Sequence, residues 1–424
     1  MNRILKGDIV YSQSETKLSS FRNGYLVIEG DRCRGVFEKI PEKFKDFPLE
    51  DYTGHLIIPG LVDLHLHAPQ YTFRSVGMDL ELLEWLNRHT FPQESRYGDL
   101  DYAKKAYEIF ANDMRKSATS RAVIFATIHR ESTELLMDLM EKTGISSYIG
   151  KVNMDRNAPD FLCEESAKKS LEDTKVWLED TKNKYQRTKP VLTPRFIPSC
   201  SDELMKGLGW MASEYHVPVQ SHLSENRSEI AWVKELCPWS TSYGDAYDKT
   251  GTFGSQSPAI MAHCVWCSDD EIELLKKRGT FIAHCPESNA NLSSGIAPVR
   301  RYLNEGIHVG LGSDVAGGTV LSIFRAMQLA VQSSKLRWSM VDDSLQPLTV
   351  PEVFYMATAG GGAFFGKVGK LEEGYEADVL VLDEGRIPTP IMEELELEER
   401  LERMIYLGSD SDILHKYVAG NQLF

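Results

Sequence analysis

Residues 59–70 read PGLVDLHLHAPQ and place three polar side chains, Asp63, His65 and His67, at alternate positions of an apolar run. Successive side chains of a strand point to opposite faces, so these three are expected on one face and the intervening leucines on the other. Three polar groups on one face of so apolar a strand indicate either a half-exposed edge strand or a set of ligands.

The sequence on either side of this stretch changes its pattern twice. Up to about residue 55 short strand-like segments alternate with turns, and the same pattern returns past about residue 366. Between them, apolar runs alternate with long amphipathic segments, which is typical of repeated strand–helix units around a parallel sheet. The candidate strands are residues 55–67, 121–128, 147–154, 189–196, 217–223, 258–264, 280–285 and 308–313.

Eight such strands fit an α/β fold of the (β/α)8, TIM-barrel type. The two ends of the chain are expected to pair with each other in one small β-sandwich. The predicted domains are therefore a barrel over residues 61–366 and a sandwich formed by residues 1–60 with 367–424. A capping-box pattern from Ser268 to Glu271, with Gly279 beyond it, predicts one of the helices. The acidic run 393–403 predicts a solvated helix.

Composition limits the kind of partner. The chain has 424 residues, 42% of them hydrophobic, and a formal net charge of −15. This charge argues against a nucleic-acid or anionic-membrane surface and favours a small-molecule partner. The sequence shows no signal-peptide pattern and no apolar run of membrane-spanning length, so a soluble, cytoplasmic protein is expected. Seven scattered cysteines do not suggest a disulfide framework.

Chemistry-bearing side chains gather at the ends of the candidate strands. They are His65, His67, His222, His263, His284 and Asp314. A lone histidine in such a place is more often a hydrogen-bonded core residue, but the active site of a (β/α)8 barrel is built from these ends. Imidazole and carboxylate suit zinc, and three or four of them leave a position open for water. The best ligand set is His65, His67, His222 and Asp314.

Glu225 is the candidate proton shuttle, because it follows His222 by three residues where the strand gives way to a loop or helix. Its alternative reading is a glutamate favoured by a helix N-terminus. Cys264 and Cys267 have the spacing of half a zinc knuckle, but no second such pair exists. The sequence also lacks the H-x-E and P-C-x-x-C deaminase signature, a G-x-S-x-G elbow and a P-loop.

The segments PGLVDLHLH, SHLSEN, AHC, HCPESN and GLGSDVAGG, in this order, resemble the amidohydrolase superfamily of metal-dependent barrel hydrolases. Within it, LLEWLNRHTFP, FATIH, KPVLTPRF, SHLSENRSEI and GSDVAGG are similar to the guanine deaminases over nearly the whole chain. The resemblance implies hydrolytic deamination of guanine to xanthine and ammonia, and a homodimer.

The resemblance also implies roles for single residues. Zinc, one ion per chain with iron as the alternative, would be bound by His65, His67, His222 and Asp314. Catalysis would be carried by Glu225, Asp314 and His263, and the substrate would be contacted by Gln70, Arg195, Phe196, His222 and His263. Binuclear members carry a bridging lysine where this chain has Arg195, so one metal is expected. Asp63 and His284 would support the site without binding metal.

Some alternatives stay open. The chain could be another aminohydrolase of the superfamily, acting on a triazine, cytosine or an adenosine-type substrate, or a non-catalytic binding protein on the same fold. The segment 71–90 is either a partial lid or a structural connection.

Overall fold

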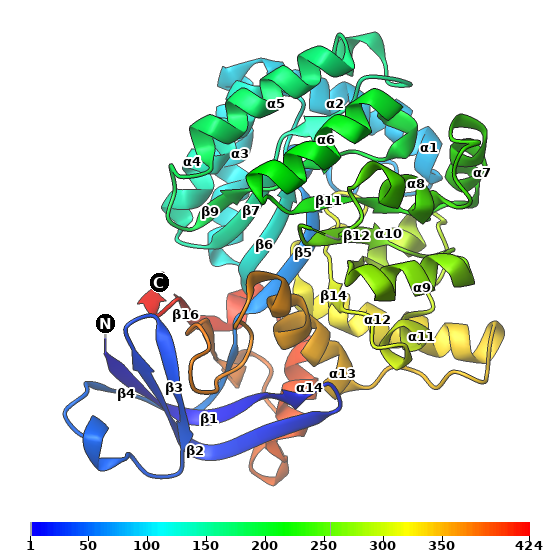
Figure 1. Ribbon diagram of the computed structural model, residues 1–424. Helices are drawn as coiled ribbons and strands as arrows, with labels where there is room; N and C mark the ends of the chain where they lie inside the picture. The colour runs from blue at the N-terminus through cyan, green and yellow to red at the C-terminus, as the bar shows by residue number, and fades with distance from the viewer. Residues whose placement is uncertain (1, 255) are drawn as a thin grey trace.

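The computed structural model describes residues 2–254 and 256–424 and has two parts (Figure 1). Parallel strands with helices around them form the larger part, and strands from both ends of the chain form a separate sheet beside it. The order in that terminal sheet is β17-β16-β15-β4-β1-β2-β3. Its strands are β1 (Arg3–Ser14), β2 (Lys17–Glu29), β3 (Arg32–Phe37), β4 (Leu49–Pro59), β15 (Val379–Leu382), β16 (Ile413–Val418) and β17 (Asn421–Gln422).

The predicted pairing of the two chain ends is confirmed. β4 pairs antiparallel with β15, with Pro59 opposite Val379 and Leu56 opposite Leu382. β4 also runs parallel to β1, so that the C-terminal strands continue the sheet that the N-terminal strands begin.

The larger part contains two parallel four-stranded sheets. One has the order β5-β6-β7-β9 and the other β11-β12-β13-β14. A short pair, β8 (Val152–Asn153) with β10 (Thr193–Pro194), extends the third and fourth candidate strands. The strands are β5 (Leu61–His67), β6 (Thr119–Phe125), β7 (Ser146–Gly150), β9 (Thr188–Pro190), β11 (Val219–Leu223), β12 (Ala259–His263), β13 (Phe281–His284) and β14 (Val309–Leu311).

Backbone hydrogen bonds join these two sheets at both margins. On one side the Leu192 amide donates to Pro218 and the Gln220 amide donates to Leu192, each at 2.9 Å. On the other side Asp314 N–H donates to the His65 carbonyl at 2.8 Å, and His67 N–H donates to Val315 at 2.9 Å.

Helices pack around the strands of both parts (Figure 1). They are α1 (Leu82–Trp85), α2 (Phe91–Ser95), α3 (Leu100–Lys116), α4 (Arg130–Thr143), α5 (Ala167–Thr181), α6 (Asp202–Tyr215), α7 (Arg227–Leu236), α8 (Tyr243–Thr250), α9 (Asp269–Arg278), α10 (Pro286–Asn291), α11 (Val299–Asn304), α12 (Ile323–Met340), α13 (Val350–Tyr355) and α14 (Leu397–Leu407). The predicted α9 begins with the Ser268–Glu271 capping box and ends at Gly279, which has a left-handed backbone.

Two predictions about single segments were wrong in part. Residues 55–67 are two strands in different sheets, because the chain leaves β4 at Gly60 and starts β5. A Cβ atom on Gly60 would lie 2.5 Å from Ser120 Oγ, so glycine permits the close approach that this change of sheet requires. The acidic run does form α14, but one face is buried, where Arg400 pairs with Asp8 and Glu384.

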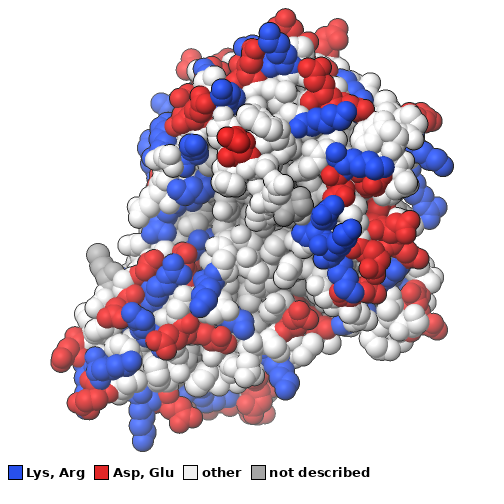
Figure 2. All heavy atoms as spheres, viewed as in Figure 1, with Lys and Arg blue, Asp and Glu red and all other residues white. Residues whose placement is uncertain are grey.

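Charged side chains of both signs are intermixed on the face shown in Figure 2, over the helices of the larger part and over the terminal sheet alike. The zone between the two parts is mainly uncharged in this view. Across residues 2–254 and 256–424, no helix has the length and apolar character needed to cross a bilayer.

A buried ion pair connects the two parts. Arg121 of β6 donates two hydrogen bonds to the carboxylate of Asp378, at 2.6 and 3.1 Å, and a third to Glu376 at 2.6 Å. The side chains of Arg121 and Asp378 are 6% and 0% exposed. A buried ion of either sign needs its partner, so the pair holds the terminal sheet against the base of β6.

We predict that Arg121→Met lowers the free energy of unfolding by about 3–5 kcal/mol, because it leaves the Asp378 carboxylate buried without its cation. Urea titration followed by circular dichroism measures the change. The matched control is Arg130→Met, which removes an ion pair from the surface (Arg130–Glu131) and is expected to cost less than about 1 kcal/mol. Equal losses in the two variants would contradict the assignment.

Candidate active site

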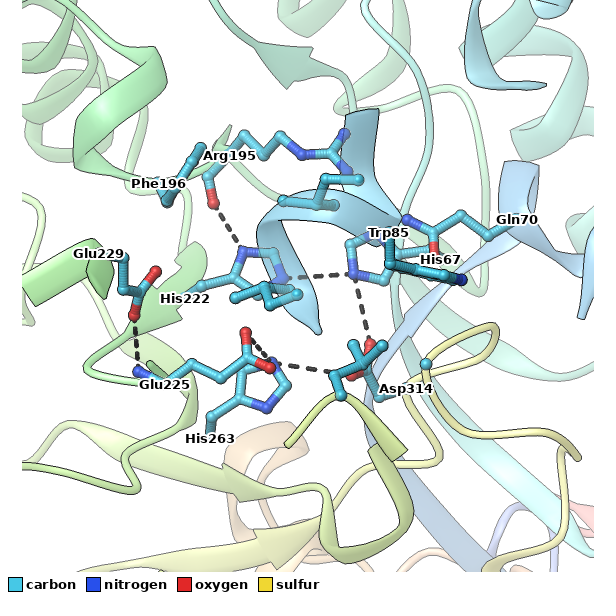
Figure 3. A pocket seen from close by; sticks show the side chains of 14 residues that line it. His67, Gln70, Trp85, Arg195, Phe196, His222, Glu225, Glu229, His263 and Asp314 are labelled. Atoms are coloured by element: carbon cyan, nitrogen blue, oxygen red, sulfur yellow. Dashed lines mark hydrogen bonds and ion pairs between the residues drawn. The ribbon is translucent and has the colours of Figure 1, made fainter. Parts of the chain in front are cut away.

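The carboxyl ends of β5, β11, β12 and β14 bring the four predicted metal ligands and the predicted catalytic residue His263 together. Figure 3 shows His67, His222, His263 and Asp314 of this group. Most of the imidazoles and the Asp314 carboxylate are buried, and His222 is partly buried. The residues are His65 and His67 of β5, His222 of β11, His263 of β12 and Asp314 after β14. The convergence follows from the parallel direction of the strands, which puts their carboxyl ends on the same side.

The face assignment of the first strand needs a correction. Pairing of β5 with β6 is irregular between Asp63 and Leu66, and Leu64 and Leu66 pack in different apolar clusters. Strict alternation is therefore broken by a local irregularity of the kind that re-aims side chains beside active sites.

Asp63 supports the neighbouring backbone. Its Oδ1 accepts hydrogen bonds from the amides of His65 at 3.2 Å and Ser313 at 3.0 Å, and its Oδ2 accepts from the Ser313 hydroxyl at 2.5 Å. Burial raises the pKa of Asp63 to about 7 despite these bonds. The carboxyl group thus connects the strand that carries two histidines to the segment that carries Asp314.

The donor atoms form overlapping groups of three among the described residues, and the atoms of each group lie within 4.8 Å of one another. Asp314 Oδ1 is 3.1 Å from His65 Nε2 and 3.5 Å from His67 Nε2. His67 Nε2 is 3.3 Å from His222 Nε2, and His263 Nε2 is 3.7 Å from Asp314 Oδ2. His65 Nε2 is buried beside the Asp314 carboxylate. Buried nitrogen and carboxylate oxygen atoms this close together are the donor set that a metal ion such as zinc takes.

The outward hydrogen bonds of two imidazoles determine where their lone pairs point. His222 Nδ1 lies 2.6 Å from the carbonyl oxygen of Arg195, which only accepts, so Nδ1 carries the proton and Nε2 of the neutral ring does not. His263 Nδ1 is 2.9 Å from Asn289 Oδ1 and is oriented in the same way. The Nε2 atom of His222 therefore presents a lone pair to the centre of the site, and the Nε2 atom of His263 faces the carboxylates of Glu225 and Asp314.

The protonation states also suit metal binding, which needs neutral imidazole and ionised carboxylate. Burial lowers the pKa of His65 and lowers those of His67 and His222 further. Burial would raise the pKa of Asp314, but His65 and the other imidazoles outweigh it and lower that pKa well below its usual range.

Glu225, which follows β11, lies beside His263. Its Oε2 is 3.4 Å from His263 Nε2, and its Oε1 accepts a hydrogen bond from the Ser294 hydroxyl at 2.8 Å. Burial raises the pKa of Glu225. Burial alone would lower the pKa of His263. The carboxylates of Glu225 and Asp314 outweigh this effect, so the pKa of His263 is raised. A carboxyl group of raised pKa beside an imidazole can hold a proton and release it to a bound substrate.

A pocket opens above these groups. Its lining includes the predicted His67, Gln70, Arg195, Phe196, His222, Glu225, His263 and Asp314. Arg195 and Phe196 follow β10, and Gln70 lies in the 3-10 helix η2 (Ala68–Phe73) directly after β5. The arginine and the amide offer hydrogen bonds at one end of the pocket, and Phe196 offers an aromatic face.

The segment 71–90 contributes to this pocket. Leu82 and Trp85 of α1, with Leu86 of the following π-helical turn η3 (Leu86–Thr90), line it with apolar surface. Its role as a cover over the site thus has a physical basis, because apolar side chains above polar groups exclude water.

Sequence reasoning missed several residues of the site. Glu229 lines the pocket and accepts a hydrogen bond from the amide of Glu225 at 2.6 Å. It also accepts from the amide of Asn226 at 3.4 Å, with which it forms a capping box. The pattern N-x-x-E in SHLSENRSE carried that signal. Asn289 and Ser294, which hold His263 and Glu225, have no comparable signal because their contacts are formed only in three dimensions.

Other candidates stay outside the cluster. Among the described residues, the groups of donor side chains close enough to share an ion contain His65, His67, His222, His263, Cys285 and Asp314. Cys264 and Cys267 belong to none of them, and neither does His284. Burial lowers the pKa of His284 to about 3, so this imidazole is neutral.

Comparisons with known proteins agree with this geometry. A model of the Amidohydrolase family matches residues 56–423. The chain is 38% identical to a guanine deaminase of Mus musculus, covering 99% of this chain and 96% of that protein, and 34% identical to the Escherichia coli guanine deaminase, covering 96% and 92%.

Among solved structures, a guanine deaminase from C. acetobutylicum with bound guanine in its active site superimposes with a TM-score of 0.97 at 46% identity over 100% of both chains. An adenosine deaminase with bound zinc, from Xanthomonas campestris, has a TM-score of 0.84 at 19% identity, which shows the common fold alone. On the match to the family model and the full-length likeness to these relatives, the chain belongs to the amidohydrolase family and, within it, to the guanine deaminases.

Proposed function

We propose that this protein hydrolyses guanine to xanthine and ammonia. The observation that carries the proposal is the pocket in which a cluster of imidazoles and a carboxylate faces an arginine, an amide and an aromatic ring. Guanine deaminases match the chain over nearly its whole length, and guanine occupies the active site of the C. acetobutylicum relative. Other nucleobase or triazine aminohydrolases are less favoured, because their solved structures resemble this chain in fold alone.

The residues that would hold one zinc ion are His65, His67, His222 and Asp314, and iron is the alternative ion. The support is the set of unprotonated nitrogens and the ionised carboxylate that point to a common centre. An ion bound there supplies a Lewis acid that lowers the pKa of a water molecule from 15.7 toward about 7.

The side chains divide the proton transfers between them. Asp314, which is ionised at the start of the reaction, accepts the first proton of the attacking water. Glu225 donates its proton to the ring nitrogen next to the attacked carbon, takes up the proton of the hydroxyl formed there and passes it to the departing amine. Asp314 then returns the first proton to Glu225. His263 lies between these two carboxyl groups and polarises the substrate. Arg195, Gln70 and Phe196 hold the purine in place.

The architecture supports the same proposal. We infer that the eight parallel strands form one closed (β/α)8 barrel over residues 61–366, because hydrogen bonds join the two sheets at both margins. Residues 1–60 and 367–424 would form the smaller β domain. A homodimer and a cytoplasmic location remain predictions, and light scattering on the purified protein measures the first.

We predict that the purified, metal-replete protein releases ammonia from guanine and much less from adenine, cytosine or their nucleosides. Arg195 offers only N–H donors, which match a ring carbonyl and oppose an exocyclic amine. Coupled ammonia detection measures each rate. Release from another base without release from guanine would refute the substrate assignment.

We predict that Glu225→Gln keeps the metal content of the wild type and lowers kcat by at least about 100-fold, because the amide cannot transfer the proton. Elemental analysis and steady-state kinetics measure the two quantities. The control is Glu235→Gln in the same helix region, where the side chain is exposed and activity is expected to be unchanged. Near-normal turnover in Glu225→Gln would remove Glu225 from its role.

We predict that dialysis against a strong chelator abolishes activity and lowers the melting temperature, since a ligand that binds only the folded state stabilises it. Adding back zinc or iron separately is expected to restore both, and elemental analysis of the untreated protein identifies the natural ion. Full activity in protein shown to be free of metal would contradict the proposed centre.

A further inference from the structure

Glu94 occupies a position next to the pocket that neither the sequence motifs nor the proposed mechanism uses. It lies in α2, is 2% exposed and is not part of the pocket lining. Its Oε1 accepts hydrogen bonds from Gln70 Nε2 at 2.8 Å and from Arg195 Nη2 at 3.2 Å, and its Oε2 accepts from Arg195 Nη1 at 2.5 Å. One carboxylate therefore binds both polar residues at that end of the pocket.

The contact gives the Gln70 amide a single orientation. A carboxylate only accepts, so the nitrogen of the amide must face Glu94. On the other side the Ala316 amide donates to Gln70 Oε1 at 3.2 Å, which requires the oxygen there. With both ends determined, Gln70 has one N–H and one lone pair left for a ligand.

The same carboxylate holds the Arg195 guanidinium by both terminal nitrogens, which is the strongest geometry for this kind of pair. The guanidinium carbon also lies 5.1 Å from the ring centre of Phe91, three residues before Glu94 in the same helix. Arg195 is 3% exposed, so its charge needs a partner inside the protein. Its remaining N–H groups are the ones available to the pocket.

The helix that carries Glu94 continues the segment that covers the pocket. α1, η3 and α2 follow one another without a break from Leu82 to Ser95. Leu82, Trp85 and Leu86 line the pocket from this segment. The Glu94 carboxylate thus connects the covering segment to Gln70, which follows β5, and to Arg195, which follows β10.

We propose that Glu94 is a positioning residue that fixes the donors and acceptors of Gln70 and Arg195 for reading the purine base. This inference rests on the proposed function, because it assigns those two residues to substrate recognition. With Arg195 held in place, its N–H donors fit the acceptor edge of guanine formed by O6 and N7, and they oppose the N6 amino donor of adenine. Loss of the positioning is expected to weaken guanine binding and to reduce this discrimination.

Two substitutions separate positioning from simple charge compensation. Glu94→Asp keeps the negative charge but shortens the side chain by one methylene, so it cannot reach both partners. Glu94→Gln keeps the length but replaces one acceptor oxygen with a donor group. For both variants we expect the KM for guanine to rise about tenfold or more, with kcat within about threefold of the wild type, because the lost contacts act mainly in binding.

One control changes another residue of α2, and the other tests the coupling between Glu94 and Arg195. Gln93→Ala removes the neighbouring side chain, which bonds Arg96 away from the pocket, and is expected to leave KM unchanged. In an Arg195→Ala background, Glu94→Asp is expected to raise the KM for guanine by a much smaller factor than it does in the wild type. The effects of two residues that act through each other are not additive.

Steady-state kinetics with guanine and adenine, with melting temperature as a check on folding, gives the answer. If the wild-type protein does not deaminate guanine, the proposed function itself fails. If the wild type is active and Glu94→Asp has a wild-type KM and selectivity, the carboxylate only compensates charge and the inference is overturned. A raised KM in the folded Glu94→Asp variant, absent in Gln93→Ala, supports it.

Discussion

The proposed active site depends on one arrangement, in which the buried carboxylate of Asp314 lies among imidazoles from three other strands. Each strand contributes only one or two of these groups, and none of them is close to Asp314 in sequence. The parallel strands must therefore be in register before any chemistry is possible. Asp63 serves this requirement directly, because it connects the histidine-bearing β5 to Ser313, the residue before Asp314.

Much of this could be predicted from the sequence, because strand periodicity and strand ends leave a local signal. Polar side chains after apolar runs indicated His65, His67, His222, His263 and Asp314, and all of them meet at one place in the structure. The pairing of the chain ends and the capping box of α9 were also predictable, since each depends on a short local pattern.

The remaining features depend on contacts between distant residues or on unusual backbone. Glu94 and Asn289 act through partners that no local pattern identifies. The backbone φ angles of Ser224, His263 and Asp314 are positive, at 48°, 72° and 46°. Residues other than glycine rarely adopt such angles. Strained backbone of this kind is common at functional sites, where the surrounding structure enforces it, and it is invisible in a propensity argument.

The ion pair between β6 and the terminal sheet has a consequence for the order of folding during synthesis. Arg121 and Asp378 are 257 residues apart in the chain. At about 5–20 residues per second, the ribosome adds Asp378 roughly 10–50 s after Arg121. During that time every strand of the two parallel sheets can leave the ribosome, but the guanidinium at the base of β6 lacks the carboxylate that neutralises it. Until Asp378 has been added, the charge of Arg121 has to stay in contact with water, so the terminal sheet completes the fold after the parallel strands have been made.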